Sequence, residues 1–296
     1  MSRLLDILGS RYPIIQGPIG AMNSPKLASA VSEAGGFGML ALGFSGPDDA
    51  KRLVAEVRTL TDKPFGANLM IMNPANREIL EVLAAAGVKV VTTSAGSPKK
   101  IFPDIHSLGL KGLHVLLSLQ HALAAEEAGA DGLVVCGAEA GGLRSVNPES
   151  STMVLVPLVT DHVKIPVVAA GGIADSRGYR AALALGAQGV QVGTRFIASE
   201  ESPAHSAWKE AIAACPDGGT TLLPLGRMTM RTIVNERLRA LMGDPKADLL
   251  SEYSYANAAK AWTTGDFDLF PAGAGDAAAL VRGIKPVKVI IDEMVK

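Results

Sequence analysis

Two glycine-rich turns hold the residues whose types and spacing best suit ligand binding. Ala170-Gly171-Gly172-Ile173 follows the apolar residues 165–169, and Val192-Gly193-Thr194-Arg195 follows the apolar residues 189–192. Glycine lets backbone N–H groups approach an anion closely, and a threonine hydroxyl adds a further donor. Because both turns follow runs typical of buried strands, we expect them to form a phosphate cradle. The alternative is that they are tight turns of a βα fold without a ligand.

A third glycine-rich segment, Gly137-Ala138-Glu139-Ala140-Gly141-Gly142, follows the apolar residues 133–136. Glu139 places a carboxylate at a strand end, where it either positions a ligand or accepts hydrogen bonds from backbone N–H groups. Arg144 follows in the same loop and suits either an anionic ligand or a solvated surface. Arg195 suits either a phosphate or a local acidic partner. The sequence leaves both options open for each of these side chains.

Two of the five histidines are candidates for proton transfer. His114 lies in the apolar residues 113–118 and can act as an acid or base if it points into a barrel; otherwise it is a hydrogen-bonded core histidine. His121 follows the end of that run and faces either the site or the solvent. No two histidines have metal-ligand spacing, so we predict no metal. Cys136 and Cys215 are too far apart to form a disulfide framework or a zinc site, and Cys136 is typical of a small buried residue.

The elements that position these loops follow a regular alternation. Short apolar runs alternate with helical segments at roughly 25-residue spacing, which indicates parallel βαβ units. Eight such units favour a (β/α)8 TIM barrel over an open sheet, and barrels often bind phosphate after strands seven and eight. We expect strands at residues 13–16, 37–42, 65–70, 89–94, 113–118, 133–136, 165–169 and 189–192. We expect the barrel helices at residues 25–34, 48–61, 76–86, 120–128, 151–163 and 175–185.

The rhythm breaks after the expected barrel, which takes residues 1–200. Residues 201–273 contain helical patterns without βα alternation, and we expect a small, mostly helical lid or substrate subdomain there. Tyr253, Tyr255 and Trp262 are concentrated in this part of an aromatic-poor chain, where they either cover a bound ligand or pack the subdomain onto the barrel. Residues 274–296 are expected to return to the barrel as a helix that Pro286 interrupts.

Composition excludes several classes of protein. The 296 residues carry a formal net charge of -1, so no basic face for nucleic acid is expected. No signal peptide and no apolar stretch long enough to span a membrane are evident, which predicts a soluble cytoplasmic protein. The expected partners are a small-molecule substrate and, as one option, further copies of the chain.

With these motifs in this order, the chain resembles the nitronate monooxygenase (formerly 2-nitropropane dioxygenase) family of FMN-dependent barrels. That family also includes flavin-type enoyl-acyl-carrier-protein reductases and NADH:quinone reductases. The resemblance rests on Pro13-Ile14-Ile15-Gln16-Gly17-Pro18, on Gly66-Ala67-Asn68-Leu69-Met70, and on the three glycine-rich segments described above, which together span most of residues 10–200.

The resemblance implies that FMN binds at the carboxyl ends of the barrel strands. The turns at residues 171–172 and 193–194 match the phosphate-binding turns of the family, and Asn68 matches a residue on the third strand that contacts the flavin ring. The segment that lies along the flavin is matched by Gln16 and Met22. The implied cofactor-binding residues are Gln16, Gly17, Met22, Asn68, Glu139, Gly141, Gly171, Gly172, Gln191, Gly193 and Thr194.

One departure from the family pattern bears on the chemistry. In catalytic members, a histidine that serves as base or proton donor follows the Glu-Ala-Gly-Gly segment, whereas this chain has Leu143. Leucine cannot transfer a proton, so deprotonation of a neutral nitroalkane by that residue is lost. The family's C-terminal Gly-Gln pair is also replaced, at Ala274-Gly275-Asp276.

We therefore expect an FMN-dependent oxidoreductase that oxidises a small anionic or nitronate-like substrate with oxygen. One alternative is an NAD(P)H-dependent flavin reductase of quinones or enoyl thioesters, with NADH or NADPH as the reductant. Alternatives of another class are a non-redox phosphate-binding barrel, such as a sugar-phosphate isomerase or aldolase, and a flavin-binding protein without the usual activity.

Overall fold

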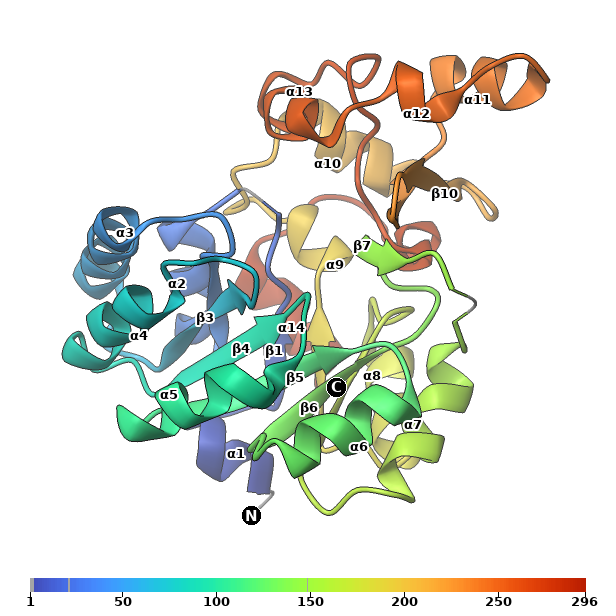
Figure 1. The fold of residues 1–296 in the computed structure, drawn as a ribbon. Helices are drawn as coiled ribbons and strands as arrows, with labels where there is room; N and C mark the ends of the chain where they lie inside the picture. The colour runs from blue at the N-terminus through green and yellow to red at the C-terminus, as the bar shows by residue number, and fades with distance from the viewer. Residues whose placement is uncertain (1–2, 21, 148) are drawn as a thin grey trace.

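Eight parallel strands form the barrel in the computed structural model of the protein, which describes residues 3–20, 22–147 and 149–296 (Figure 1). The strand order is β1-β9-β8-β6-β5-β4-β3-β2. A parallel bridge between Ile15 and Phe37 joins β1 to β2 and closes the ring. The strands are β1 Ile14–Gln16, β2 Gly38–Ala41, β3 Phe65–Met70, β4 Val90–Ser94, β5 Lys111–Leu116, β6 Gly132–Cys136, β8 Val167–Ala170 and β9 Gly189–Val192.

Helices surround the strands as βα alternation requires. They are α2 Pro25–Glu33, α3 Pro47–Leu60, α4 Asn76–Ala85, α5 Ile101–Ser107 after the 3-10 turn η1 Pro98–Lys100, α6 Leu119–Glu127, α7 Thr152–Thr160, α8 Ser176–Ala184 and α9 Thr194–Ile197. The predicted TIM barrel is confirmed, with strand and helix ends that differ from the predicted ones by at most three residues. The sequence did not predict α5 or the N-terminal helix α1 (Arg3–Leu8). Within the described residues no helix is both long and apolar enough to cross a bilayer.

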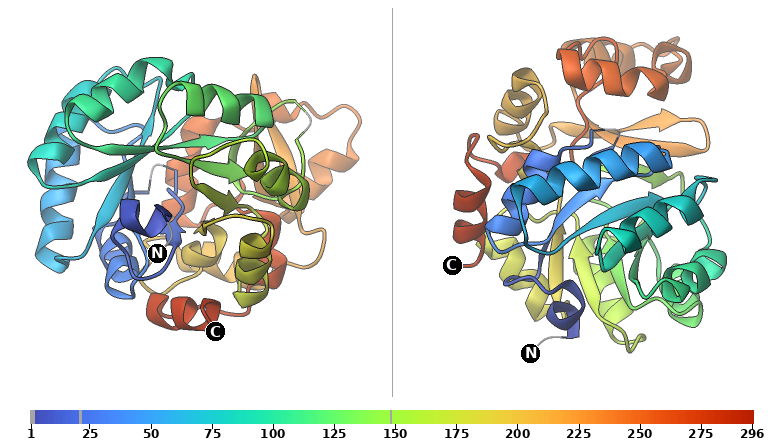
Figure 2. Two further views of the ribbon diagram at one scale, coloured as in Figure 1. Left: turned by 90° about the horizontal axis from the view of Figure 1, so that it is seen from below. Right: turned by 90° about the vertical axis from the view of Figure 1, so that its left-hand side faces the viewer.

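Two apolar layers hold the barrel together. Inside the ring, one buried cluster joins residues from six strands, and α1 closes its lower end with Leu4 and Leu8 (Figure 2, left). A second, larger cluster lies mostly between the strands and the helices and continues into the C-terminal part of the chain. Because neighbouring residues of a strand point to opposite faces, Leu113 and Val115 face the inner cluster whereas His114 points to the helix layer.

The segment after the barrel lies over the carboxyl ends of the strands (Figure 1). Its helices are α10 Ser206–Ala213, α11 Glu236–Gly243, α12 Leu249–Glu252, the 3-10 turn η2 Tyr255–Asn257 and α13 Ala258–Thr264. It also contains a hairpin that the sequence did not predict, β10 Thr220–Leu225 and β11 Met228–Ile233. The hairpin pairs through β11 with β7 (Gly142–Ser145), so part of the predicted loop after β6 is a strand.

The chain then returns to the barrel through η3 (Asp276–Leu280) and α14 (Val287–Met294). The buried residues Val287, Ile290, Ile291 and Met294 lie on one face of α14, and the helix packs on α2, α8 and α9. Figure 2 (right) shows this helix beside the barrel wall. Pro286 directly precedes α14, a position where the missing N–H and fixed φ of proline are tolerated.

Gly38 on β2 tests how closely helix and strand pack. A Cβ atom at this position would lie 1.9 Å from the carbonyl oxygen of Ala28 on α2. We expect Gly38→Ala to lower the free energy of unfolding in urea by about 3 kcal/mol, because backbone must move to admit the methyl group. Gly46→Ala is the matched control, since a Cβ there meets nothing within 4 Å. Equal stability of the two variants would contradict this packing.

Candidate functional site

A cavity of about 450 Å³ opens at the carboxyl ends of the strands, beneath the hairpin and the helices that follow the barrel. This is the end of a TIM barrel at which ligands bind, and the volume is that of a small-molecule site. Its walls are mainly apolar. The residues that line it include Gly17, Asn68, Glu139, Gly141, Leu143, Gly171, Gly172, Gln191, Gly193, Thr194, Met228 and Met230.

The two glycine turns lie side by side on the neighbouring strands β8 and β9, and both line the cavity. Gly171 and Gly172 have φ values of 102° and 74°, which are left-handed conformations that favour glycine. Among the described residues, no protein acceptor binds the N–H groups of Gly172, Gly193 or Thr194. A Cβ on Gly193 would meet nothing within 4 Å, so its space is open. The turns therefore offer unpaired backbone donors to an anion.

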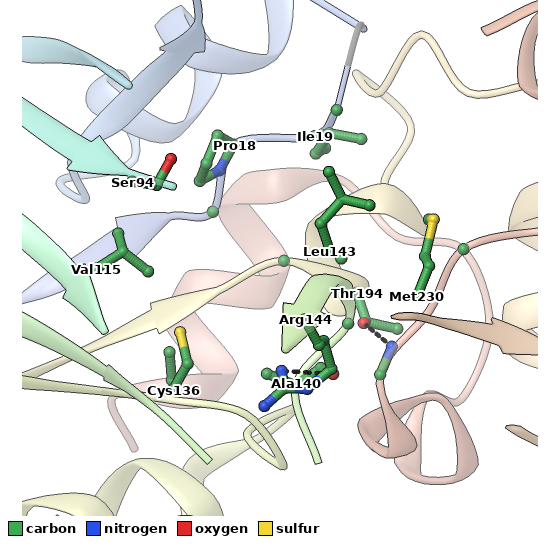
Figure 3. A pocket seen from close by; sticks show the side chains of 18 of the residues that line it. Pro18, Ile19, Ser94, Val115, Cys136, Ala140, Leu143, Arg144, Thr194 and Met230 are labelled. Atoms are coloured by element: carbon green, nitrogen blue, oxygen red, sulfur yellow. Dashed lines mark hydrogen bonds between the residues drawn. The ribbon is translucent and has the colours of Figure 1, made fainter. Parts of the chain in front are cut away.

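Thr194 connects this cradle to the C-terminal part of the chain. Its hydroxyl oxygen accepts a hydrogen bond of 2.9 Å from the N–H of Gly275 (Figure 3). A hydroxyl that accepts from one side keeps its own proton for a second partner. The segment Ala274-Gly275-Asp276 thus lies against the cradle.

Arg144 takes neither of the two roles that the sequence allowed. The side chain is 1% exposed and pairs with the carboxylate of Glu149. Its guanidinium also donates to the carbonyl oxygen of Ala140 at 3.1 Å (Figure 3) and to that of Gly137 at 2.8 Å. The arginine therefore holds the loop after β6 in shape, with its donors directed at the protein.

Glu139, like Arg144, has a structural role: its carboxylate accepts hydrogen bonds from groups of the protein. Its Oε2 accepts hydrogen bonds from the N–H of Thr152 at 2.8 Å and from the Thr152 hydroxyl at 3.0 Å, at the start of α7. The same hydroxyl lies 3.1 Å from the carbonyl oxygen of Gly171. Although Glu139 lines the cavity, its carboxylate is engaged by the helix start.

Asn68 and Gln191 supply the polar side chains on the floor of the cavity. Asn68 donates to the Thr92 hydroxyl at 2.9 Å, and its carbonyl oxygen lies 3.4 Å from the Ser94 hydroxyl. The Oε1 atom of Gln191 is buried and has no partner among the described residues. A buried amide oxygen without a partner is costly unless a ligand satisfies it.

Gln16 and Met22, which the resemblance assigns to cofactor binding, lie outside the cavity lining. Gln16 uses its carboxamide to bridge β1 and β2: its Nε2 donates to the carbonyl oxygen of Met39 at 3.0 Å and its Oε1 accepts from the N–H of Met39 at 3.3 Å. Met22 is buried in the outer core cluster. Neither side chain lines the cavity, although Gly17, next to Gln16, does.

The two candidate proton-transfer histidines also lie outside the cavity. His114 is a hydrogen-bonded core histidine, with Nδ1 2.8 Å from the Thr93 hydroxyl. Burial, helped by the nearby His121, lowers its pKa to about 4. His121 is exposed on the first turn of α6. Among the described residues that line the cavity, none is a histidine or a lysine.

Cys136 lies at the cavity floor, at the end of β6 (Figure 3). Burial raises the pKa of its thiol to about 11, so the sulfur stays protonated at neutral pH and is a poor nucleophile. With no lysine in the described lining and with Glu139 engaged, the lining offers no nucleophile for aldolase-type chemistry. This argues against the non-redox barrel.

The sequence missed much of the cavity's apolar lining. Leu143 on β7 and Met230 on β11 are directly opposite in the antiparallel register. Of the predicted aromatic cluster, Tyr255 and Trp262 line the cavity and also pack on Phe270, with ring centroids about 6.0 Å apart. These two side chains therefore pack the subdomain and also face the cavity. The hairpin methionines carried no signal in the sequence, because their position depends on pairing with β7.

Comparison with known proteins identifies the family. The model of the nitronate monooxygenase family matches residues 1–84 and 76–296. The chain belongs to the nitronate monooxygenase family. It is 32% identical to the nitronate monooxygenases of Paraburkholderia phytofirmans and Pseudomonas aeruginosa over 97% of its length, covering 92% and 97% of those proteins.

Two solved structures are similar to this chain over nearly its whole length. FabK from Thermotoga maritima is 38% identical, with a TM-score of 0.91 over 100% of this chain and 95% of that one. A nitroalkane oxidase from Streptomyces ansochromogenes is 28% identical, with a TM-score of 0.83 over 99% and 96%. Membership of this family makes the chain a flavin-dependent oxidoreductase that acts on a small molecule.

The buried His114 predicts a specific pH dependence of stability. Its pKa is about 4 when folded, against 6.5 for the free side chain. Between these values the unfolded state binds more protons, so stability falls as the pH falls from about 6.5 to about 4. We expect this loss to reach about 3 kcal/mol and to be absent in His114→Gln. Urea unfolding of both proteins at pH 7 and pH 4 measures it; a stability difference that does not change with pH would refute the assignment.

Proposed function

We propose that the chain binds FMN, with the phosphate held by the turns at residues 171–172 and 193–194. The unpaired N–H groups and the open space beside Gly193 suit a phosphate. The partnerless Oε1 of Gln191 suits a donor on the ring or the ribityl chain. Asn68 presents an amide to the same cavity. When bound, FMN would supply the acceptor for two electrons from the substrate.

We further propose that the substrate is a preformed anion of the nitronate type and that oxygen is the final acceptor. The observation that carries this proposal is Leu143, which lines the cavity at the position where catalytic relatives are expected to have histidine. The nearby ionisable groups cannot replace it: Glu139 binds Thr152, Arg144 binds Glu149, and the thiol of Cys136 has a raised pKa. An anion that arrives deprotonated needs no base.

The protein's own contribution is then to bind, orient and exclude water. The hairpin and β7 cover one side of the cavity with apolar side chains, which lowers the local dielectric and strengthens hydrogen bonds to a bound anion. The side chains of Asn68 and Gln191 orient the ligand from the barrel side.

A second candidate is an NAD(P)H-dependent reductase of quinones or enoyl thioesters. The observation in its favour is the apolar surface of Leu143, Met228 and Met230 in the cavity, which offers more apolar contact than a small nitronate requires. The 38% identity to FabK over the whole chain is compatible with it. A proton from water would complete the reduction, since the cavity lacks a donor at Leu143.

Anaerobic stopped-flow bleaching of the flavin separates the two candidates. We expect rapid bleaching by a preformed alkyl nitronate, slow bleaching by NADH or NADPH, and reoxidation on admission of oxygen. Rapid bleaching by a reduced nicotinamide, with none by nitronate, would overturn the first candidate in favour of the second.

Leu143→His tests the missing base. We expect the wild-type protein to oxidise nitronates but not neutral nitroalkanes, and the variant to gain at least about tenfold in rate toward neutral nitroalkanes, because a positioned base typically contributes about 10²–10⁴-fold. Leu143→Gln is the matched control, since it adds polarity without a base. Equal rates of the two variants toward neutral nitroalkanes would show that position 143 does not decide the protonation state of the substrate.

A further inference from the structure

Arg195 is a buried cation directly beside the second glycine turn. It follows Thr194 on the single turn of α9, and the residue is 5% exposed. Its Nη2 donates to the carbonyl oxygens of Ala198 at 3.0 Å and Gly283 at 2.9 Å, whereas its Nε is buried and has no partner among the described residues. The acceptors that hold this guanidinium are therefore neutral.

No carboxylate of the described residues lies within 4 Å of the guanidinium. Glu293 on α14 is the carboxylate whose charge acts on Arg195, and both of its oxygens already lie 2.8 Å from the Nζ of Lys285. Two cations and one carboxylate leave one positive charge without a partner. Burial lowers the pKa of Arg195, as expected of a cation that is removed from water without a close anion.

The sequence allowed either a phosphate or a local acid as the partner of Arg195, and the structure provides no acid at ion-pair distance. The guanidinium does not line the cavity, so it does not touch a ligand bound there. Consecutive Cα atoms lie about 3.8 Å apart, which keeps the charge within one side-chain length of the turn at Thr194. An anion on that turn would therefore feel the charge through the protein.

The hydrogen bonds of Arg195 also hold the surroundings of the turn. The Thr194 hydroxyl accepts from the N–H of Gly275 (Figure 3), and Arg195 binds the carbonyl oxygen of Gly283, so two successive residues hold both ends of one C-terminal segment. Ala277 in this segment lines the cavity. Arg195 thus has a structural role, from which any effect of its charge must be separated by experiment.

We propose that the charge of Arg195 makes the site selective for flavins that carry a phosphate. The turns at residues 171–172 and 193–194 make the direct hydrogen bonds, and Arg195 attracts the dianion without touching it. This inference rests on the proposed binding of FMN. Charges interact more strongly through protein, where the effective dielectric constant is about 20, than through water, where it is about 80. Loss of the charge should therefore weaken the binding of FMN and leave that of riboflavin unchanged.

Arg195→Gln and Arg195→Lys separate charge from structure. The glutamine keeps a side-chain donor and loses the charge, whereas the lysine keeps the charge and loses the guanidinium geometry. Each flavin is titrated with apoprotein, and binding is followed by the quenching of flavin fluorescence. We expect Arg195→Gln to bind FMN at least about tenfold more weakly, with wild-type affinity for riboflavin. Arg195→Lys should keep the wild-type preference for FMN.

Glu293→Gln tests the same charge from the surface, where a substitution endangers folding least. The side chain of Glu293 is 47% exposed, and removal of its carboxylate leaves Arg195 and Lys285 with no anion between them. We expect its FMN affinity to rise about twofold, since exposed charges are partly screened, and its riboflavin affinity to stay the same. Asp292→Asn is the matched control, because the preceding side chain is 42% exposed and pairs with Lys288 instead.

The outcomes separate this inference from the function on which it rests. If the wild type binds neither flavin, or both equally, the proposed phosphate site fails and the inference with it. If the wild type prefers FMN and Arg195→Gln keeps that preference, or weakens both flavins by the same factor, the function stands and the role of the charge is refuted. Loss of the preference in Arg195→Lys, or equal FMN affinities of Glu293→Gln and Asp292→Asn, would refute it as well, and the surface pair decides if Arg195→Gln does not fold.

Discussion

The site depends on the ion pair and the hydrogen bonds that the buried guanidinium of Arg144 makes. It binds Glu149 and the carbonyl oxygens of Gly137 and Ala140, so it folds the loop after β6 back on itself. A buried charge is expensive unless it is paired and fully hydrogen-bonded, and removing one partner of such a pair typically costs about 3–5 kcal/mol. The loop therefore has one strongly preferred shape, and the residues that it carries into the cavity are fixed with it.

The shape of this loop determines the rest of the site. Glu139 binds the N–H of Thr152, and the Thr152 hydroxyl reaches the carbonyl oxygen of Gly171, which connects the loop to the first glycine turn. On its other side, β7 gives the hairpin an edge with which to pair. Arg231 on β11 then binds Asp276 and the carbonyl oxygen of Ala138, which ties the hairpin to both the loop and the C-terminal segment. Segments more than 100 residues apart in the chain thus meet around one cavity.

The sequence predicted the features that local residue patterns determine, and it missed those that depend on strand pairing over long distances in the chain. The alternation of apolar runs and helices was sufficient for the barrel, and the glycine turns were sufficient for the candidate phosphate site. The sequence could not place His114, because side chains alternate between the two faces of β5. A shift of one residue decides whether the imidazole faces the barrel interior or the helices. The side chain of Gln16 lies outside the cavity because a carboxamide can also hydrogen-bond to backbone groups, which Met39 supplies here. The hairpin could not be predicted, since its partner β7 lies some 80 residues away and looks like a loop.

The most direct test of this account compares the affinity of the apoprotein for FMN and for riboflavin, which lacks the phosphate. Each hydrogen bond to a charged group contributes about 1.5–3 kcal/mol, so we predict that the wild-type protein prefers FMN by at least about tenfold. Gly193→Val fills the open space beside the turn without backbone strain, and should lose this preference, whereas Gly243→Val on α11 should keep it. Equal affinity of the wild-type protein for the two flavins, or an unchanged FMN preference in Gly193→Val, would contradict the claim that these turns hold the phosphate.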